Sequence, residues 1–481
     1  MRLFTLLGCL PFLGLATAQL IGPVGPTTPL HEKRRICNVL DFGAVPDNST
    51  DVADALESAF NYCVLRHPGS RLVIPEGSYL LNRSVVLSNA TNWAFQVDGL
   101  ISLGYGGNYT VARELVLQGY VGADVLNSTI NGEGDGHFLI DALVIVNPVD
   151  FEFYSETGRG AFQGQGYLWR NANNTDRPRL IRLVSPINAV VHDLILVDSP
   201  KFHIVLDFVE NVEVYHITVR GANLGSYDGV DIIGTNYWVH DIEVTNRDEC
   251  VSVKSPPNHG LAEDLVYNQA GSGVSIGSLN HARNISIIGG NNIAFIKTYP
   301  GGSGYVTNIT FENFRSKASQ YGLNINQYWQ NKNEPDTGSV ALSNLIFRNF
   351  SGSVVNGVRR PPLYLVANDL TFARNVTVED ISIWTEANGY VVNTISKVFG
   401  QGDDSYSPND GLKTLGVGET PTPYTTAITV TATPTGWTLP PSPTWAVPDT
   451  GYGTNIPIPV YEPTPLWRPY GDYSLHYWGT F

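Results

Sequence analysis

The chain has 481 residues, a formal net charge of −15 and only 15% charged residues, so it is long enough for a large core but has few charges. Its negative balance excludes a general affinity for nucleic acid, which depends on positive side chains that neutralise phosphates. A pI near 5 indicates a protein that works in acid, where part of the negative charge is neutralised.

The N-terminus has the pattern of a secretory signal peptide over residues 1–18. Arg2 is followed by the apolar run 3–15 and by the small residues 16–18. This run is too short to cross a bilayer, and no other stretch qualifies, so we expect no membrane partner. The pattern predicts a secreted, extracellular protein that begins near Gln19.

Ten Asn-x-Ser/Thr sequons agree with export and predict a glycosylated surface, at Asn48, Asn82, Asn89, Asn108, Asn127, Asn173, Asn284, Asn308, Asn349 and Asn375. Cys9 leaves with the signal peptide. In an oxidising compartment we expect Cys37 and Cys63 to form a disulfide. Cys250 is then left over, and we interpret it as a small buried core residue rather than a redox group.

Short apolar segments recur along the chain at a nearly constant spacing. Their central residues are separated by 23, 25 and 23 residues, at Leu194, Ile217, Ile242 and Leu265. The series continues with segments that begin at Asn284 and, 24 residues later, Asn308, and after longer insertions at Asn344 and Asn375. Repeats of 20 to 25 residues that alternate apolar and polar side chains and end in Gly/Asn turns are typical of a β-solenoid.

No helical pattern separates the repeats, so the sequence predicts an all-β fold, a right-handed single-stranded parallel β-helix over residues 19–401. One segment does have helical spacing, Asp54–Val64, and we expect it to cap the open N-terminal end of the solenoid. Residues 402–481 form a Pro/Thr-rich extension, which we expect to be extended and O-glycosylated. Its aromatic residues either bind sugar or lie along the solenoid: Trp437, Trp445, Tyr452, Tyr461 and Trp467.

Four acidic residues lie within 22 positions, Asp228, Asp231, Asp248 and Glu249, with Lys254 close behind. Carboxylates crowded together cannot all ionise, so the pKa of one should rise and make it a general acid, while its ionised partners activate water. Paired acids of this kind are typical of glycoside hydrolysis.

Coil spacing suggests how these residues meet. Asp207, Asp228 and Asp248 are 21 and 20 residues apart, so we expect them to form a column on successive coils, with Lys297 about two coils beyond Asp248. Lys254 and Lys297 would hold a substrate carboxylate. Two alternatives stay open: Asp207 and Asp231 belong to structural Asx ladders, or the carboxylates bind calcium.

Several motifs point to a known family. The segments 40–51 and 74–79 are similar to the first coil of pectin-lyase-like β-helices, and Gly-Gln-Gly-Tyr-Leu-Trp (164–169) resembles a Gly-x-Gly-x-x-Trp turn. With these motifs the chain resembles the pectin-degrading glycoside hydrolases of family 28 from about Asn38 to about Trp384. That resemblance implies a parallel β-helix and hydrolysis with inversion of configuration.

The active-site motifs narrow the resemblance. Polygalacturonases carry Asn-Thr-Asp, Asp-Asp, Gly-His-Gly and Arg-Ile-Lys, where this chain has Ser-Tyr-Asp (226–228), Asp-Glu (248–249), Gly-Ser-Gly (271–273) and Phe-Ile-Lys (295–297). Asp-Glu-Cys-Val (248–251) and the following Val-Lys-Ser are similar to the fungal rhamnogalacturonan hydrolase branch.

The resemblance to this branch implies roles for individual residues. Asp248 would be the general acid, and Asp228 and Glu249 would position and deprotonate the water. Asp207 and Asp231 would support the site, next to the substrate-binding Lys254 and Lys297. The mechanism implied needs no metal and no cofactor. Phe295 and Ser272, in place of Arg and His, would remove positive charge where a neutral rhamnose sits.

These observations predict a secreted, monomeric, inverting hydrolase that cleaves the galacturonic acid–rhamnose backbone of rhamnogalacturonan I in pectin, with endo action. Four alternatives remain: an exo-acting pectin hydrolase, a polygalacturonase, a calcium-dependent polysaccharide lyase on the same fold, and a β-helix that binds carbohydrate without cleaving it.

Overall fold

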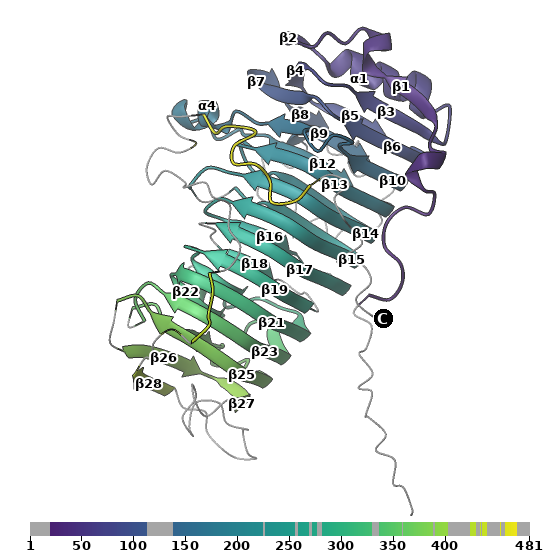
Figure 1. The fold of residues 1–481 in the computed structure, drawn as a ribbon. Coiled ribbons are helices and arrows are strands. Elements are labelled where there is room, and N and C mark those ends of the chain that lie inside the picture. Colours follow the sequence, from purple (N-terminus) through teal and green to yellow (C-terminus); the bar gives the residue numbers. More distant parts are fainter. Residues whose placement is uncertain are drawn as a thin grey trace, which may run out of the picture.

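The computed structural model describes residues 20–112, 138–224, 227–254, 258–268, 272–276, 281–329, 336–357, 359–387, 390–402, 424–429, 433, 435–439, 453 and 457–468. The predicted signal peptide, Asn127, Trp445 and Tyr452 lie outside these ranges. The described residues form one elongated solenoid whose strands stack along a single axis (Figure 1). The predicted right-handed parallel β-helix is confirmed.

The coils present three faces. One face, which we call the site sheet, consists of β5 (Val85–Ser88), β9 (Phe138–Val146), β12 (Arg179–Val184), the first residues of β14 (Ile204–Arg220) and β15 (Val230–Thr245), β16 (Glu249–Val253), β18 (Ser272–Ile276), β20 (Asn292–Lys297), β22 (Tyr321–Asn326), β24 (Leu363–Val366) and β26 (Tyr390–Ser396). These strands are parallel, and β8 (Thr110–Ala112) and β28 (Tyr424–Thr429) add antiparallel strands to β9 and β26.

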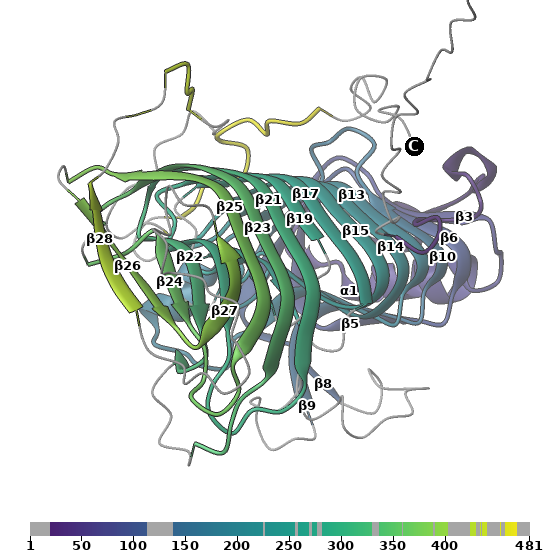
Figure 2. The ribbon, with the colours of Figure 1, turned by 90° about the horizontal axis from the view of Figure 1, so that it is seen from below.

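The other two faces begin as two series of short strands. One series is β1 (Arg35–Asn38), β3 (Ser70–Ile74), β6 (Thr91–Val97) and β10 (Val149–Tyr154), and the other is β2 (Asp47–Asp51), β4 (Ser78–Arg83), β7 (Leu100–Asn108) and β11 (Ala161–Gln163). Both series merge into long strands that bend through two faces, as Figure 2 shows for the later coils: β13 (Ile187–Val197), β17 (Asn258–Asn268), β19 (His281–Ile288), β21 (Tyr305–Ser319), β23 (Ala341–Val354) and β25 (Ala373–Thr385), followed by the short β27 (Val398–Gly402).

The strand register tests the predicted repeat. Leu194 pairs with Ile217 and Ile242 pairs with Leu265, as the spacing predicts. One predicted alignment is wrong: Ile285 pairs with Phe314, so Asn284 lies beside Asn313 and not beside Asn308. This coil is longer because a loop between β20 and β21 adds residues to it.

Asparagine ladders hold the turns in register. The amide Nδ2 atoms of Asn344 and Asn375 donate to Asn308 and Asn344 at 3.0 and 2.7 Å, and Asn349 donates to Asn313 at 2.7 Å. These asparagines have positive φ, a conformation that asparagine tolerates better than most residues. The predicted sequons at Asn308, Asn349 and Asn375 therefore also have a structural role, and their glycosylation stays a prediction.

A hydrophobic core fills the solenoid. Side chains alternate along each strand, so that Ile204 and Leu206, like Val251 and Val253, point inward and are at most 1% exposed. Like residues stack from coil to coil, as in the Phe311–Phe347 pair, whose ring centroids are 5.1 Å apart.

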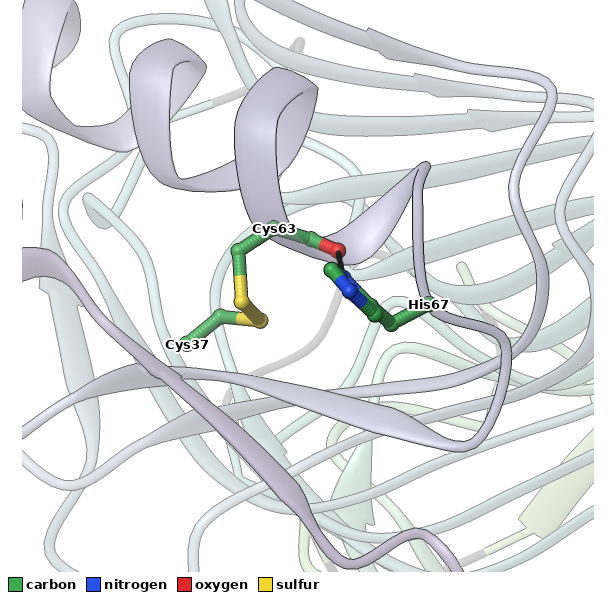
Figure 3. The surroundings of a disulfide bond; sticks show 3 residues. All are labelled: Cys37, Cys63 and His67. Atoms are coloured by element: carbon green, nitrogen blue, oxygen red, sulfur yellow. Dashed lines mark hydrogen bonds between the residues drawn. A yellow bond between two sulfur atoms is a disulfide. The ribbon is translucent and has the colours of Figure 1, made fainter.

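A helical cap closes the N-terminal end, as the sequence predicts. Helix α1 (Ala53–Ala59) continues into a π-helical turn (Phe60–Val64) that packs Phe60 edge-on against Trp93 at 5.2 Å. The predicted disulfide joins Cys37 of β1 to Cys63 of this turn, and the Nδ1 of His67 donates to the carbonyl oxygen of Cys63 at 2.9 Å (Figure 3). Cys250 is the free cysteine among the described residues and is buried in the core.

Three described stretches of the C-terminal extension lie on the solenoid. The first is β28, which pairs with β26. Trp437 packs edge-on against Trp384 of β25 at 5.1 Å. Gly453 and residues 457–468, which we call the C-terminal strap, pass over the early coils beside helix α4 (Gly166–Asn171), where they are drawn in yellow in Figure 1. The aromatic residues described here thus pack on the solenoid, the second of the two predicted alternatives. Within the described ranges, no helix has the length and hydropathy needed to cross a bilayer.

Candidate active site

The predicted catalytic acids lie at the turns that lead into two neighbouring strands of the site sheet. Asp228 precedes β15 by two residues, and Asp248 and Glu249 stand at the start of β16. Val230 pairs with Val251, which brings Asp228 level with Glu249. The strands approach closely at Gly229, where a Cβ would lie 2.5 Å from the carbonyl oxygen of Cys250, so only glycine fits.

This arrangement gathers three carboxyl groups. Asp228, Asp248 and Glu249 each offer an oxygen, and these oxygens all lie within 4.8 Å of one another. The Nζ of Lys254 lies 3.5 Å from Asp228 and 3.4 Å from Asp231, and Lys297 forms an ion pair with Glu249. The structure therefore brings together six of the seven predicted site residues.

The seventh, Asp207, lies outside this cluster, so the predicted column is wrong. Ile204 pairs with Val230, 26 residues later, because a long connection between β14 and β15 lengthens this coil. Asp207 is thereby shifted past Asp228 and accepts a hydrogen bond from Arg182 at 2.6 Å. Arg182 and Arg179 also bind the buried Asp141, at 3.2 and 3.1 Å.

Burial and charge separate the proton affinities of the two adjacent acids. Burial and a hydrogen bond with Glu249 raise the pKa of Asp248 to about 7. Burial would also raise the pKa of Glu249, but the bond from Asp248 and the charge of Lys297 lower it to about 2. At acid pH the shared proton therefore resides on Asp248, beside an ionised Glu249.

The third acid, Asp228, also favours its protonated form. Burial raises its pKa well above the ordinary value, and the charges of Asp231, Glu249 and Asp248 add to this effect. Lys254 opposes this shift. Burial would lower the pKa of Lys254, but the charges of Asp231 and then Asp228 raise it. Lys254 therefore lies between Asp228 and Asp231 and is a partner of both carboxyl groups.

Three further residues orient the acids. The backbone N–H groups of Tyr227 and Glu249 donate to the two carboxyl oxygens of Asp248, at 2.8 and 3.0 Å. The side-chain Nδ2 of Asn246 donates to the Tyr227 carbonyl at 2.9 Å. The Nδ1 of His203 donates to the Asp228 carbonyl at 3.0 Å, and burial lowers the pKa of His203 to about 4, so the ring is neutral.

Sequence reasoning assigned no role to Tyr227, Asn246 or His203. Tyr227 and Asn246 stand one and two residues before an acid, a signal that could have drawn attention to them. His203 comes from a different coil, and its contact depends on the strand register.

An aromatic pair lies beside the acids. Phe295 is only 2% exposed because Trp329 packs edge-on against it, with ring centroids 5.1 Å apart. The half-buried Trp329, not Phe295, therefore offers the accessible ring, and the Nζ of Lys297 lies 5.9 Å from its centroid. Ser272 pairs with Glu249 in the sheet register, and its side chain lies outside the described part of the chain.

Carboxylates of this kind are ligands for hard cations. In this cluster, two ammonium groups already lie against four carboxyl groups, and two of the acids favour their protonated form. The absence of a metal and a cofactor from the mechanism stays a prediction.

Comparison with known proteins agrees with this geometry. Residues 72–399 match the model of the glycosyl hydrolases family 28. The chain belongs to this family. It is a glycoside hydrolase, and its family 28 relatives include a rhamnogalacturonase A of Aspergillus niger, 37% identical over 94% of both chains, and a rhamnogalacturonase A of Aspergillus aculeatus, 36% identical over 97% of both.

Solved structures of the family support the fold. The endo-xylogalacturonan hydrolase of Aspergillus tubingensis has a TM-score of 0.57 and 21% identity, over 79% of this chain and 98% of that chain. A polygalacturonase of Erwinia carotovora also has a TM-score of 0.57, at 16% identity, over 76% of this chain and 96% of that chain. At these identities the likeness concerns the fold alone.

Proposed function

We propose that this family 28 enzyme hydrolyses the galacturonic acid–rhamnose backbone of rhamnogalacturonan I, outside the cell and as a monomer. The observation that carries the proposal is the pair of adjacent acids with separated pKa values, one protonated and one ionised. Most glycoside hydrolases use such a pair. One acid protonates the leaving glycosidic oxygen, and one carboxylate either activates the attacking water or attacks the sugar itself.

The roles follow from the proton positions. Asp248 donates its proton to the glycosidic oxygen, and Glu249, which Lys297 keeps ionised, takes a proton from the attacking water. Asp228, which retains its proton, orients that water rather than deprotonating it. Lys254 stays charged beside Asp231 and is placed to attract a galacturonate carboxylate.

The stereochemistry of cleavage needs its own test, because the family resemblance and the short distance between the acids favour different outcomes. The resemblance to family 28 implies inversion, whereas acids less than about 5.5 Å apart ordinarily accompany retention. We propose inversion, since the ion pair with Lys297 makes Glu249 a poor nucleophile. Proton NMR of the first reducing ends formed decides between the two: the released anomer should be opposite to the cleaved linkage.

The aromatic pair supports rhamnogalacturonan as substrate. Polygalacturonan presents a carboxylate on every sugar, whereas rhamnogalacturonan alternates galacturonate with rhamnose, which has an apolar methyl group. Trp329 and Lys297 place one apolar ring and one cation side by side, which suits an alternating chain. The names of the Aspergillus relatives agree with this choice.

A digest with two substrates tests the proposal. The secreted protein is incubated at acid pH with debranched rhamnogalacturonan and, separately, with polygalacturonate, in the presence of a chelator, and the products are sized. We expect oligosaccharides of mixed length from rhamnogalacturonan alone, the pattern of endo action. Monosaccharide alone would indicate exo action, and cleavage of polygalacturonate alone would contradict the proposed substrate.

Two other classes give different products. A polysaccharide lyase would release unsaturated sugars that absorb in the ultraviolet and would stop when calcium is chelated. A carbohydrate-binding β-helix would release no reducing ends from either substrate. The Asp248→Asn variant serves as the matched inactive control for all of these assays.

A further inference from the structure

The C-terminal strap is bound to the solenoid through its backbone. Arg220 donates to the Val460 carbonyl at 2.8 Å, and Gln163 donates to the Ile458 carbonyl at 3.1 Å. Ile458 is 1% exposed and packs on Ala161, Ile195 and Val197. The strap is thus a built part of the molecule and not a loose linker.

One strap contact leads towards the active site. The Nε of Arg170, on helix α4, donates to the carbonyl of Gly453, and the NH2 of the same guanidinium binds the buried Asp198. Asp198 in turn accepts a hydrogen bond from the N–H of Tyr167 at 3.0 Å, which fixes the start of α4. Arg170 is therefore held between the strap and the solenoid.

The other face of Arg170 supports Tyr227. Its guanidinium lies 4.9 Å from the centroid of the Tyr227 ring, and the guanidinium of Arg177 lies 5.3 Å from the same ring and donates to its hydroxyl at 2.6 Å. Tyr227 is 3% exposed, so its ring is enclosed. Its backbone N–H donates to Asp248 at 2.8 Å. A continuous series of contacts thus joins the strap to the proposed general acid.

We propose that the C-terminal strap positions the general acid: Gly453 holds Arg170, Arg170 holds the ring of Tyr227, and the N–H of Tyr227 holds the carboxyl group of Asp248. Arg170 and Tyr227 are positioning residues. The role of Asp248 comes from the proposed function above, on which this inference rests, whereas the contacts themselves do not depend on the substrate.

Two glycines of the extension provide a matched pair of variants. Gly453 has φ +69°, and a Cβ there would lie 2.8 Å from the Cβ of Ala222, so Gly453→Ala should displace this carbonyl. Because Ala222 lies in the connection between β14 and β15 that leads to Tyr227, the route through Arg170 also requires the same effect in the Arg170→Lys variant described below. Gly436 has φ +84° with no atom within 4 Å of an added Cβ. Gly436→Ala introduces similar backbone strain beside Trp437, which packs on β25, far along the solenoid from Asp248.

The first readout is catalysis on debranched rhamnogalacturonan with the full-length protein. We expect Gly453→Ala to lower kcat roughly tenfold, with KM within about twofold, because a small misplacement of a catalytic group costs rate rather than binding. Gly436→Ala should match the wild type. A strap that only stabilised the fold would lower the melting temperature of Gly453→Ala and leave kcat unchanged.

The pH at which kcat falls on the alkaline side provides a further test, because the direction of its change in Gly453→Ala can be predicted. The Tyr227 N–H favours the ionised form of Asp248 and so lowers its pKa. The other titratable groups that face Asp248 are Glu249, Asp228 and the Cys250 thiol. Two lysines act on it indirectly, Lys297 through Glu249 and Lys254 through Asp228. Loss of the Tyr227 bond should therefore move the limb to higher pH in Gly453→Ala while kcat falls.

The second readout does not need a substrate. Hydrogen exchange at the Tyr227 amide should be faster in Gly453→Ala than in Gly436→Ala and the wild type. Faster exchange in an enzyme that fails to cleave rhamnogalacturonan would reject the proposed function and keep the inference. Wild-type kcat, pH profile and Tyr227 exchange in Gly453→Ala would overturn the inference alone.

Arg170→Lys provides a second variant if Gly453→Ala does not fold. Lysine keeps the charge opposite Asp198 but cannot stack on Tyr227 and bind Gly453 and Asp198 through a planar fork. The same fall in kcat and the same faster exchange are expected. A wild-type kcat and exchange rate in Arg170→Lys would overturn the proposal.

Discussion

Two clusters of buried charge meet at the neighbouring strands β14 and β15 of the site sheet, and their charge balance differs. The first contains Asp141 and Asp207 with Arg179 and Arg182, two acids and two bases. The second contains Asp228, Asp231, Asp248 and Glu249 with only Lys254 and Lys297.

The balance determines the state of the protons. Burial alone would raise the pKa of Asp141, but Arg182 and Arg179 lower it. Burial raises the pKa of Asp207, although the same two arginines oppose that shift. In the second cluster burial, and after it the neighbouring acids, raise the pKa values of Asp228 and Asp248. In the first cluster each acid has an arginine partner, whereas in the second the acids outnumber their two lysines and Asp248 holds a proton that is available for chemistry.

The largest expected effect comes from removing the stored proton. Asp248→Asn should lower kcat on rhamnogalacturonan by about 10³-fold, since general acid catalysis contributes roughly 10²–10⁴-fold. Circular dichroism checks that the fold is retained. A variant with more than a tenth of the wild-type rate would remove Asp248 from the role of acid.

The same variant should be more stable than the wild type near neutral pH. The folded pKa of Asp248 lies above its unfolded value, so its contribution to stability is present in acid and is lost as the pH rises through about 7. The gain in melting temperature of Asp248→Asn over the wild type should therefore grow between about pH 4 and pH 7. A gain that shrank with pH would contradict the raised pKa.

The balanced cluster should respond in the opposite way. Arg182→Met leaves Asp207 without its 2.6 Å partner, and breaking a buried ion pair costs about 3–5 kcal/mol. We expect a lower free energy of unfolding in urea, with kcat per folded molecule close to that of the wild type. The double variant Arg182→Met/Asp207→Asn should recover part of the lost free energy of unfolding. A stable Arg182→Met variant with a low kcat would show that the first cluster also takes part in catalysis.

A smaller effect is expected from Lys297, which keeps Glu249 ionised. In Lys297→Met the pKa of Glu249 should rise, so the acid limb of the rate profile moves to higher pH, and kcat at the optimum should fall about tenfold. If the pH of the acid limb did not change in Lys297→Met, a group other than Glu249 would determine it.

The smallest effect is expected at the aromatic pair. Trp329→Ala should raise KM for rhamnogalacturonan by a few-fold to about tenfold, the equivalent of the roughly 0.5–1.5 kcal/mol that one aromatic contact contributes, with kcat little changed. The loss should be larger for rhamnogalacturonan than for polygalacturonate. An equal rise in KM on both substrates would show that Trp329 does not determine substrate preference.

The fold and most of the acid cluster could be predicted because they depend on local patterns. Alternating apolar residues define the strands, and Asp248 and Glu249 are neighbours in sequence, so their meeting needs no knowledge of the register. Asp228 joins them because the next coil adds 21 residues between paired positions, close to the expected period.

Contacts that depend on loop length could not be predicted. Asp207 was misplaced because its coil spans 26 residues between paired positions. The support of Tyr227 by Arg170 joins segments that are 57 positions apart in the numbering, and Gly453 reaches Arg170 from 283 residues away. The burial of Phe295 behind Trp329 likewise follows from packing between coils that no periodicity reveals.

The most direct test of the central claim is the pH dependence of kcat/KM on debranched rhamnogalacturonan, which reports the ionisations of the free enzyme. We expect kcat/KM to rise as Glu249 ionises near pH 2, to stay high through the acid range, and to fall as Asp248 loses its proton near pH 7. A fall near pH 4, the pKa of an ordinary aspartate, would contradict the claim that burial beside other carboxylates keeps the catalytic proton on Asp248.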